Sequence, residues 1–435
     1  MSSTVGAIGR AENPEFGESV YKKVTLRLIP FLFLCYVVAY LDRVNVGFAK
    51  LQMMSDLKFS DAVYGIGAGI FFLGYFLFEV PSNIILSRTG ARVWIARIMV
   101  TWGIISSLML FVNSEATFYA LRLVLGMAEA GFFPGIILYL TYWFPASRRA
   151  RIVALFMTAI AFAGVIGGPL SGWIMQYFDK VHGWAGWQWL FLLEGIPSII
   201  VGIWVFFFLD DSIRAAKWLN DAEKNYLEKE IAADSTTKVE MKLGAVFSNG
   251  KVWLLSIIYF CCIMGLYGIS FWLPQLIKNA GAKDVLHVGL LTSIPYAFAA
   301  IGMVLIGKNS DRTGERRWHI AICALVGAAG LLASTLFGDQ ISLSMIALSV
   351  ATVGILSTLP LFWTLPTAFL GGTAAAAGIA IINSIGNLAG FASPYAIGAI
   401  RDATGSTAIG MYVLAGSLCL GALCVLVGVS RSMGR

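Results

Sequence analysis

The chain has 435 residues, of which 58% are hydrophobic and 13% are charged, and its mean hydropathy is +0.79. These values indicate a membrane protein and exclude an ordinary soluble domain. The net charge of +7 is explained by the distribution of Lys and Arg described below, so nucleic acid is not an expected partner. All six cysteines fall inside apolar runs, which favours packing roles over disulfides or metal ligands.

Apolar runs of roughly 20 residues, enough to cross a bilayer as a helix, recur along the chain. The first six lie near 26–48, 64–86, 94–112, 118–142, 152–176 and 188–209, and six more near 252–277, 287–307, 319–337, 343–369, 376–400 and 408–429. We therefore expect an all-α membrane protein with twelve transmembrane helices in two six-helix bundles, residues 26–209 and 252–429. A tail (1–25), a charged linker (210–251) and a second tail (430–435) complete it, and the linker is expected to turn helical after Asn220 or Asp221.

The distribution of basic residues predicts the orientation. If both termini are cytoplasmic, the cytoplasmic segments hold 22 of the 31 Lys and Arg residues and the outer segments hold six. Cytoplasmic loops of membrane proteins carry such an excess of positive charge. The first twenty or so residues are polar and lack a secretory signal pattern, so the first span is expected to remain uncleaved. We expect a multi-pass protein of a bacterial-type inner membrane.

An internal repeat supports the two-bundle plan. Arg88-Thr89-Gly90 after the second span recurs as Arg312-Thr313-Gly314 after the eighth, 224 residues later. The later copy is fuller and reads Gly307-x-x-x-Asp311-Arg312-x-Gly314-x-Arg316-Arg317. Two parallel halves related by an axis along the membrane normal are expected from this pattern.

Four charged residues lie deep inside the first and fourth spans: Asp42, Arg43, Arg122 and Glu129. Each costs at least about 2.5–3.5 kcal/mol to insert, so such residues suggest function. Arg122 and Glu129 are seven residues apart, which places them on nearly the same helix face but too far apart for good direct pairing. Each therefore needs a partner elsewhere: another helix, water or substrate.

Asp42 and Arg43 are sequence neighbours, so on a helix they point about 100° apart. Either residue could face a central cavity while the other faces an adjacent helix. We favour Arg43 as an anion ligand and Asp42 as a titrating or gating group; a fixed partner of an arginine is the alternative for Asp42. Burial favours the neutral form of a carboxyl group, which suits Glu129 to proton carriage. Two other buried acids, Glu79 and Glu194, are expected to be structural.

The C-terminal spans contain no Asp, Glu, Lys or Arg in their interiors. The buried charges and the ion coupling would therefore belong to the N-terminal half. Neutral polar groups of the C-terminal half would recognise the shape of the substrate. Packing or helix association by amide hydrogen bonds is the alternative for each of these groups. The full set of candidate substrate-binding residues is Arg43, Arg122, Tyr75, Tyr267, Trp272, Gln275, Trp363, Thr364, Asn383 and Asn387.

The chain resembles major facilitator superfamily transporters over nearly its whole length. The match to the superfamily's inner-loop motif is the Gly307–Gly314 segment. Within the superfamily the chain resembles the anion:cation symporters. The residues that carry this likeness are Tyr40-Leu41-Asp42-Arg43-Val44-Asn45, Tyr75-Phe76-Leu77-Phe78-Glu79-Val80-Pro81-Ser82-Asn83, Arg122-x6-Glu129-Ala130-Gly131-x-x-Pro134-Gly135 and Asn383-x-x-Gly386-Asn387-x-x-Gly390.

The resemblance implies that Arg43 and Arg122 bind a substrate anion and that Asp42 and Glu129 are linked to coupling protons. It also implies a gating role for the inner-loop residues Gly307, Asp311, Arg312, Gly314, Arg316 and Arg88. We expect a symporter that imports a carboxylate-bearing organic anion such as tartrate, phthalate, a hydroxyaromatic acid or a sugar acid. The coupling ion would be H⁺, with Na⁺ as the alternative, and the protein would act as a monomer.

The rival function is an organic-anion exchanger or an exporter of amphipathic compounds. It is favoured by the glycines of the segment Gly164-x-x-Gly167-Gly168-Pro169-x-x-Gly172 and by the aromatic content. An enzyme is not expected, because the sequence shows no metal-ligand cluster, nucleophile motif or phosphate loop. No cofactor or metal is expected; the expected partners are membrane lipid and a small organic anion.

Overall fold

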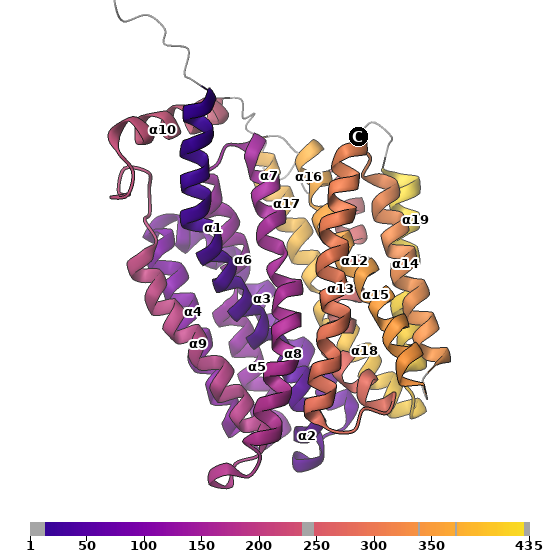
Figure 1. Ribbon diagram of the computed structural model, residues 1–435. Coiled ribbons are helices and arrows are strands. Elements are labelled where there is room, and N and C mark those ends of the chain that lie inside the picture. The colour runs from indigo at the N-terminus through magenta and orange to yellow at the C-terminus, as the bar shows by residue number, and fades with distance from the viewer. Residues whose placement is uncertain (1–13, 237–247, 338–339, 370–371, 430–435) are drawn as a thin grey trace, which may run out of the picture.

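The computed structural model describes residues 14–236, 248–337, 340–369 and 372–429, and these residues form helices without any strand (Figure 1). Most of the predicted N-terminal tail, the C-terminal tail and part of the linker lie outside them. The N-terminal half comprises α1 (Pro14–Val44), α2 (Val46–Leu57), α3 (Asp61–Thr89), α4 (Ala91–Leu108), α5 (Glu115–Glu129), α6 (Phe132–Thr141), α7 (Ala146–Met157), α8 (Ala159–Tyr177) and α9 (Gly186–Phe208).

The C-terminal half comprises α12 (Gly250–Asn279), α13 (Val285–Thr313), α14 (Arg317–Leu336), α15 (Ile341–Phe362), α16 (Thr364–Phe369), α17 (Gly372–Asn387), α18 (Ala389–Thr404) and α19 (Ala408–Gly428). Between the halves, α10 (Asp221–Thr236) begins at a residue predicted to start the linker helix. It is held against α1 by an ion pair of 2.8 Å between Lys23 Nζ and Glu223 Oε2.

Eleven helical runs among the described residues are long and apolar enough to span a membrane. They coincide with eleven of the twelve predicted spans. The remaining predicted span, 376–400, is covered by α17 and α18, which are divided at Leu388. Each of these two helices has 16 residues, so neither alone is long enough to cross a bilayer.

Two spans are interrupted directly after predicted functional residues. α1 ends one residue after Arg43, and α5 ends at Glu129. At the second break Gly131 adopts φ +86°, and a Cβ atom there would lie 2.3 Å from Ser82 Oγ. Only glycine fits this position without strain. Broken membrane helices are typical of transporter binding sites, because irregular backbone is tolerated beside a cavity.

The two halves meet along α8 with α13 and along α3 with α18. Glycines permit the contact: a Cβ on Gly168 would lie 2.5 Å from the carbonyl oxygen of Gly289, and one on Gly65 would lie 2.5 Å from that of Pro394. Both contacts lie toward the end of the molecule that carries α2, here called the α2 face. The opposite end, near α10, is called the α10 face (Figure 1).

Candidate functional site

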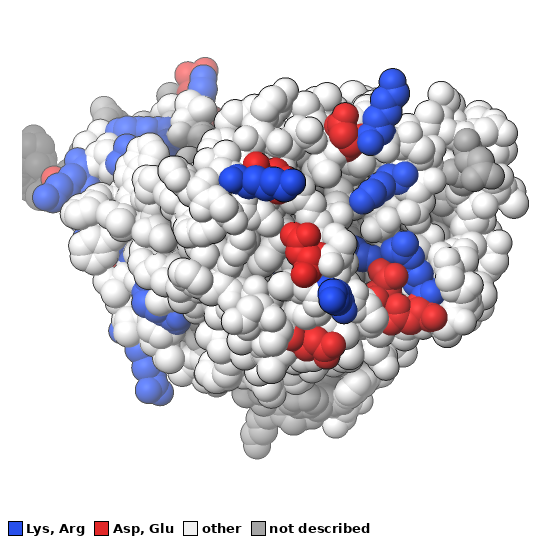
Figure 2. Space-filling model, turned by 90° about the horizontal axis from the view of Figure 1, so that it is seen from below, with Lys and Arg blue, Asp and Glu red and all other residues white. Residues whose placement is uncertain are grey.

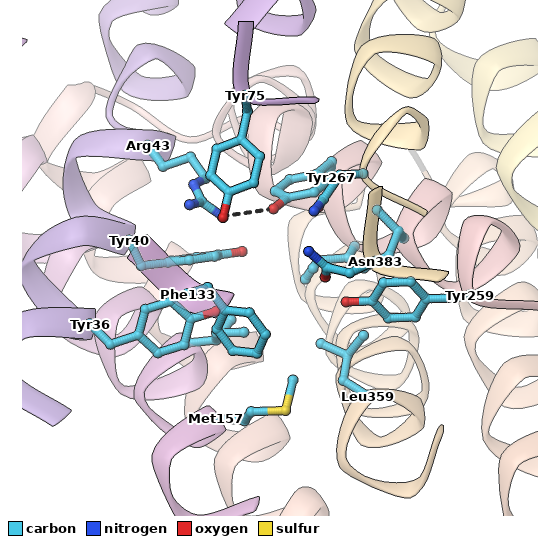
Figure 3. A pocket seen from close by; sticks show the side chains of 14 residues that line it. Tyr36, Tyr40, Arg43, Tyr75, Phe133, Met157, Tyr259, Tyr267, Leu359 and Asn383 are labelled. Carbon is cyan, nitrogen blue, oxygen red and sulfur yellow. Dashed lines mark hydrogen bonds between the residues drawn. The ribbon is translucent and has the colours of Figure 1, made fainter. Parts of the chain in front are cut away.

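A central cavity lies between the two halves (Figure 3). It measures about 400 Å³, including the part open to solvent. The N-terminal half contributes Tyr36, Tyr40, Arg43, Tyr75, Phe133, Met157 and Ile160, and the C-terminal half contributes Tyr259, Ile263, Leu266, Tyr267, Leu359, Asn383 and Asn387. Among these lining residues Arg43 alone is charged. The cavity therefore offers one cation, surrounded by hydroxyl, amide and apolar groups.

Arg43 uses its guanidinium group to join three helices. Its Nη2 forms an ion pair with Glu129 of α5, and its Nη1 donates a hydrogen bond of 3.0 Å to the Tyr267 hydroxyl of α12. The guanidinium carbon also lies 5.5 Å from the ring centroids of Phe71 and Tyr75 on α3. A cation this deeply buried is tolerated because a carboxylate and aromatic faces compensate its charge.

Arg122 lies apart from this cavity. Its Nε donates to the Gly67 carbonyl at 3.1 Å and its Nη2 to the Ala68 carbonyl at 3.0 Å, and the residue is fully buried. Arg122 is enclosed in this way because α3 and α5 approach closely, with Gly126 packed on the backbone of Phe71. Arg122 and Glu129 thus find partners on other helices, as their spacing required. Both guanidinium groups lie over the Phe71 ring, 5.5 Å from its centroid for Arg43 and 5.0 Å for Arg122, but of the two only Arg43 lines the cavity. The anion-binding role of Arg122 therefore stays a prediction.

Asp42 points away from the cavity, so of the two orientations open to this neighbouring pair, Arg43 faces the cavity. The Asp42 carboxylate accepts hydrogen bonds from Trp102 Nε1 at 2.9 Å, from Ser106 Oγ at 2.9 Å and from Ser198 Oγ. These donors belong to α4 and α9. None of the ion pairs formed by the described residues involves Asp42, which disfavours the alternative of a fixed arginine partner.

The other candidate substrate ligands divide into two groups. Tyr75, Tyr267, Asn383 and Asn387 line the cavity. Trp272, Gln275, Trp363 and Thr364 do not line it in this conformation, and their role as substrate ligands stays a prediction. On α12, Trp272 is five residues beyond Tyr267 and therefore points about 140° away from it around the helix. Gln275 lies about 12 Å from Tyr267 along the helix axis. Trp363 instead packs on the Tyr259 ring at 5.0 Å, and Thr364 donates to the Leu361 carbonyl at 2.6 Å.

Sequence reasoning missed several cavity residues. Tyr36 and Tyr40 share a helix face with Arg43, at positions i, i+4 and i+7, and this spacing was a signal for their placement. Glu79, expected to be structural, bridges the two halves. Its carboxylate accepts hydrogen bonds from Asn383 Nδ2 at 2.6 Å and from Ser384 Oγ at 3.0 Å, so it holds a cavity-lining amide in place.

The cavity is closed toward the α2 face by a charged network. Lys50 of α2 pairs with Asp61 of α3, and Arg401 of α18 pairs with the same carboxylate at 3.0 Å. The Lys50 ammonium also lies 3.8 Å from the Trp272 ring centroid, and Asp402 accepts from the Asp61 amide at 2.9 Å. Figure 2 shows this face, with acidic and basic side chains beside one another across its middle. The halves are thus locked together there.

The predicted inner-loop motif lies at the α10 face. Asp311 pairs with Arg316, which also donates to Ser310 Oγ at 2.8 Å. Gly314 caps α13 with φ +65°, a conformation that favours glycine. Arg88 and Arg312 are exposed at the ends of α3 and α13, and the space around Gly307 is open. In this conformation the ion pair of the motif lies within the C-terminal half, and its gating role stays a prediction.

The sequence matches the family model of the Major Facilitator Superfamily over residues 32–394. This chain belongs to that superfamily. Its members are transporters, so this protein is a multi-pass membrane transporter and not an enzyme, and the predicted fold class is confirmed. The xylose transporter XylE from E. coli, in a partially occluded inward open conformation, has the same fold, with a TM-score of 0.73, 14% identity, and coverage of 93% of this chain and 99% of that one.

Two relatives within the superfamily are named for different compounds. A protein of Agrobacterium vitis to which tartrate transport is assigned is 50% identical over 417 residues, covering 95% of this chain and 96% of its own length. The quinolone resistance transporter of Acinetobacter baumannii is 41% identical over 404 residues, covering 92% of each chain. This superfamily member is therefore similar both to a protein named for tartrate transport and to one named for quinolone resistance.

Proposed function

We propose that the protein is a proton-coupled symporter that imports a carboxylate-bearing organic anion by alternating access. The observation that carries the proposal is the ion pair between Arg43 and Glu129 at the wall of the central cavity. The Glu129 carboxylate occupies the place on the guanidinium that a substrate carboxylate would take. Substrate and Glu129 are therefore competitors for one cation.

This competition provides the coupling. A substrate anion that binds Arg43 displaces Glu129, and an unpaired carboxylate buried at this depth is costly. Proton uptake by Glu129 removes that cost. Anion and proton then bind more tightly together than either binds alone, because the binding of each favours the other by the same free energy.

Neutralisation of the anion by protons also determines whether the membrane potential opposes import. A unit charge that crosses a potential of 100 mV gains or loses about 2.3 kcal/mol, and an anion is opposed when the inside is negative. One proton per monoanion removes the opposing term, and a second proton adds a driving force. The Lys and Arg distribution supports an inner-membrane protein with a cytoplasmic α10 face, so that the α2 face, closed here, would be the outer one.

The C-terminal half supplies recognition of the rest of the substrate. Tyr267, Asn383 and Asn387 offer hydroxyl and amide groups opposite Arg43, which suits a hydroxylated or aromatic acid better than a plain fatty acid. Tartrate, phthalate, hydroxyaromatic acids and sugar acids are the proposed class. The relative assigned to tartrate transport supports this choice.

The second candidate function is organic-anion exchange or export of amphipathic compounds. The 41% identical quinolone resistance transporter favours it, as do the many aromatic side chains of the cavity. An exporter would move substrate outward in exchange for protons, so the two candidates predict opposite dependence on the proton gradient.

The test is a ligand-stabilisation screen on the purified protein, followed by uptake in proteoliposomes. Tartrate, phthalate, 4-hydroxyphenylacetate, galactonate and a fluoroquinolone are the probes. We expect an acid to raise the melting temperature and to accumulate when the lumen is more alkaline than the medium. Stabilisation by the fluoroquinolone alone, or accumulation driven by a gradient of the opposite sign, would contradict the proposal.

A further inference from the structure

A second pair of acids lies within the N-terminal half, away from the central cavity. Asp42 of α1 is 1% exposed and Glu194 of α9 is 3% exposed. Ser198, which donates to Asp42, is one helical turn from Glu194 on α9, and the two carboxyl groups are close enough to interact electrostatically. The proposed symport mechanism does not use Glu194.

No cation balances this pair. None of the ion pairs found in the described part of the chain includes either acid. The groups around Asp42 are Trp102 and Ser106 of α4 and Ser198 of α9, and Arg43, its neighbour in sequence, points to Glu129. Burying one unpaired ion costs several kcal/mol, so two adjacent carboxylates cannot both be ionised here.

The hydrogen bonds distinguish the two acids. Asp42 accepts from three donors, as an ionised carboxylate does. Glu194 accepts one hydrogen bond, of 2.7 Å from Ser171 Oγ to Oε1. Its Oε2 is buried without a partner among the described residues, and so are both amide atoms of Asn45, whose side chain lies against the same carboxyl group. A proton on Oε2 would turn this unsatisfied acceptor into a donor for the Asn45 oxygen.

A route to Glu194 runs through a second cavity between the halves. Ser171 lines this cavity together with Gly167 and Gly168 of α8 and with Thr292 and Tyr296 of α13. The only titratable side chain on its wall is Tyr296, whose hydroxyl donates to Ser270 at 3.4 Å. The cavity lies where α8 and α13 close the α2 face. Separation of the halves at this face admits water to Ser171 and thus to Glu194.

We propose that Asp42 and Glu194 form a second proton-binding site, in which Glu194 carries the proton and Asp42 carries the charge. The site takes its proton from the α2 face through the cavity beside Ser171. This second site depends on the proposed symport only for the role of its proton, because a second proton per anion would supply a driving force for import. The binding of the proton itself is a property of the protein without substrate.

Infrared difference spectroscopy of the purified full-length protein at neutral pH tests the site without any substrate. Glu194→Gln is expected to remove the C=O stretching band of one protonated, buried carboxyl group. Asp42→Asn is expected to remove the bands of an ionised carboxylate instead. Ser171→Ala is the control, because it deletes the hydrogen bond to Oε1 but keeps the acid; it should shift the Glu194 band without removing it.

Loss of ionised-carboxylate bands in Glu194→Gln would overturn the proposal, and so would loss of the protonated band in Asp42→Asn alone. Neither result depends on the symport assay, so failure of this site and failure of the proposed function are distinguishable. Glutamine has nearly the volume of glutamate, and a melting curve identifies any variant that has lost its fold. If Glu194→Gln unfolds, Ser171→Ala takes its place. A protonated-carboxyl band that persists in Ser171→Ala and disappears as the pH rises supports the site, and the absence of such a band at neutral pH overturns it.

Discussion

Arg43 donates a hydrogen bond of 3.0 Å to Tyr267, and these two residues stand 224 residues apart, at equivalent positions of the internal repeat. The offset is the one that separates the two Arg-Thr-Gly segments. The pseudo-symmetry axis therefore passes close to the cavity, and at the same level one half presents a cation while the other presents a hydroxyl group. Substrate that bridges the two residues also bridges the two halves.

The first prediction concerns Arg43 itself. Arg43→Gln keeps side-chain hydrogen bonding but removes the cation, so affinity for the transported acid should fall about 100-fold or more, as expected for one partner of a buried charge pair. Arg43→Lys keeps the charge and should lose less affinity. Isothermal titration of the purified variants measures both. Equal affinities of Arg43→Gln and the unaltered protein would place the anion elsewhere.

Arg122 should behave differently in the same assay. Its two hydrogen bonds to α3 carbonyls are charge-assisted, and each contributes about 1.5–3 kcal/mol. Arg122→Gln should therefore lower the melting temperature in the absence of substrate, while the folded fraction keeps most of its affinity. If the affinity falls as far as in Arg43→Gln, Arg122 reaches the substrate in another conformation, as the family resemblance implies.

Glu129→Gln separates proton coupling from binding. The glutamine cannot titrate, and it no longer competes for Arg43 as a charged group. Uptake driven by a pH gradient should be lost, whereas exchange of labelled for unlabelled acid across proteoliposomes should persist. Full proton-driven accumulation by this variant would mean that coupling resides in other groups.

The network at the α2 face should set the balance between conformations. Lys50→Met removes the cation that Asp61 and the Trp272 ring share, so the halves should part more often at that face. Spin labels at the exposed positions Ser55 and Ala403, in a chain whose six cysteines are replaced, report the separation by double electron–electron resonance. A longer distance population should grow in Lys50→Met.

Lys58→Met is the matched control for this measurement, since Lys58 is an exposed lysine of the same face that takes part in none of the ion pairs described. Its distance distribution should equal that of the unaltered chain. An identical distribution in Lys50→Met as well would show that packing of the glycine contacts, not charge, keeps this face closed.

Hydrophobic length and helical phase made much of this architecture predictable. Runs of apolar residues located the spans because a bilayer demands about 20 of them per helix. The 100° step per residue indicated that Asp42 and Arg43 diverge, and the seven-residue spacing indicated that Arg122 and Glu129 need partners on other helices. These are properties of a single helix, and they require no knowledge of its neighbours.

The partners themselves depend on how helices are rotated and tilted against one another, which no local pattern specifies. Glu129 could have paired with Arg122 or with Arg43. Glycines allow α3 to pack closely on α5, and this packing encloses Arg122 and leaves Arg43 as the partner of Glu129. Trp272 was grouped with Tyr267 as a ligand because both are polar aromatics of one span. Their different directions around α12 send one to the cavity and the other to Lys50.

The pairing of Arg43 with Glu129 has a consequence for the half of the cycle in which nothing is carried. In the proposed symport, the carrier must reorient empty after substrate and proton leave, before it can load again. Once the ion pair is restored, the positive charge of Arg43 and the negative charge of Glu129 cross the electric field together, so this pair contributes no gating charge. Any effect of membrane voltage on the empty return must then come from other buried charges, such as Asp42, which takes part in none of the ion pairs of the described residues.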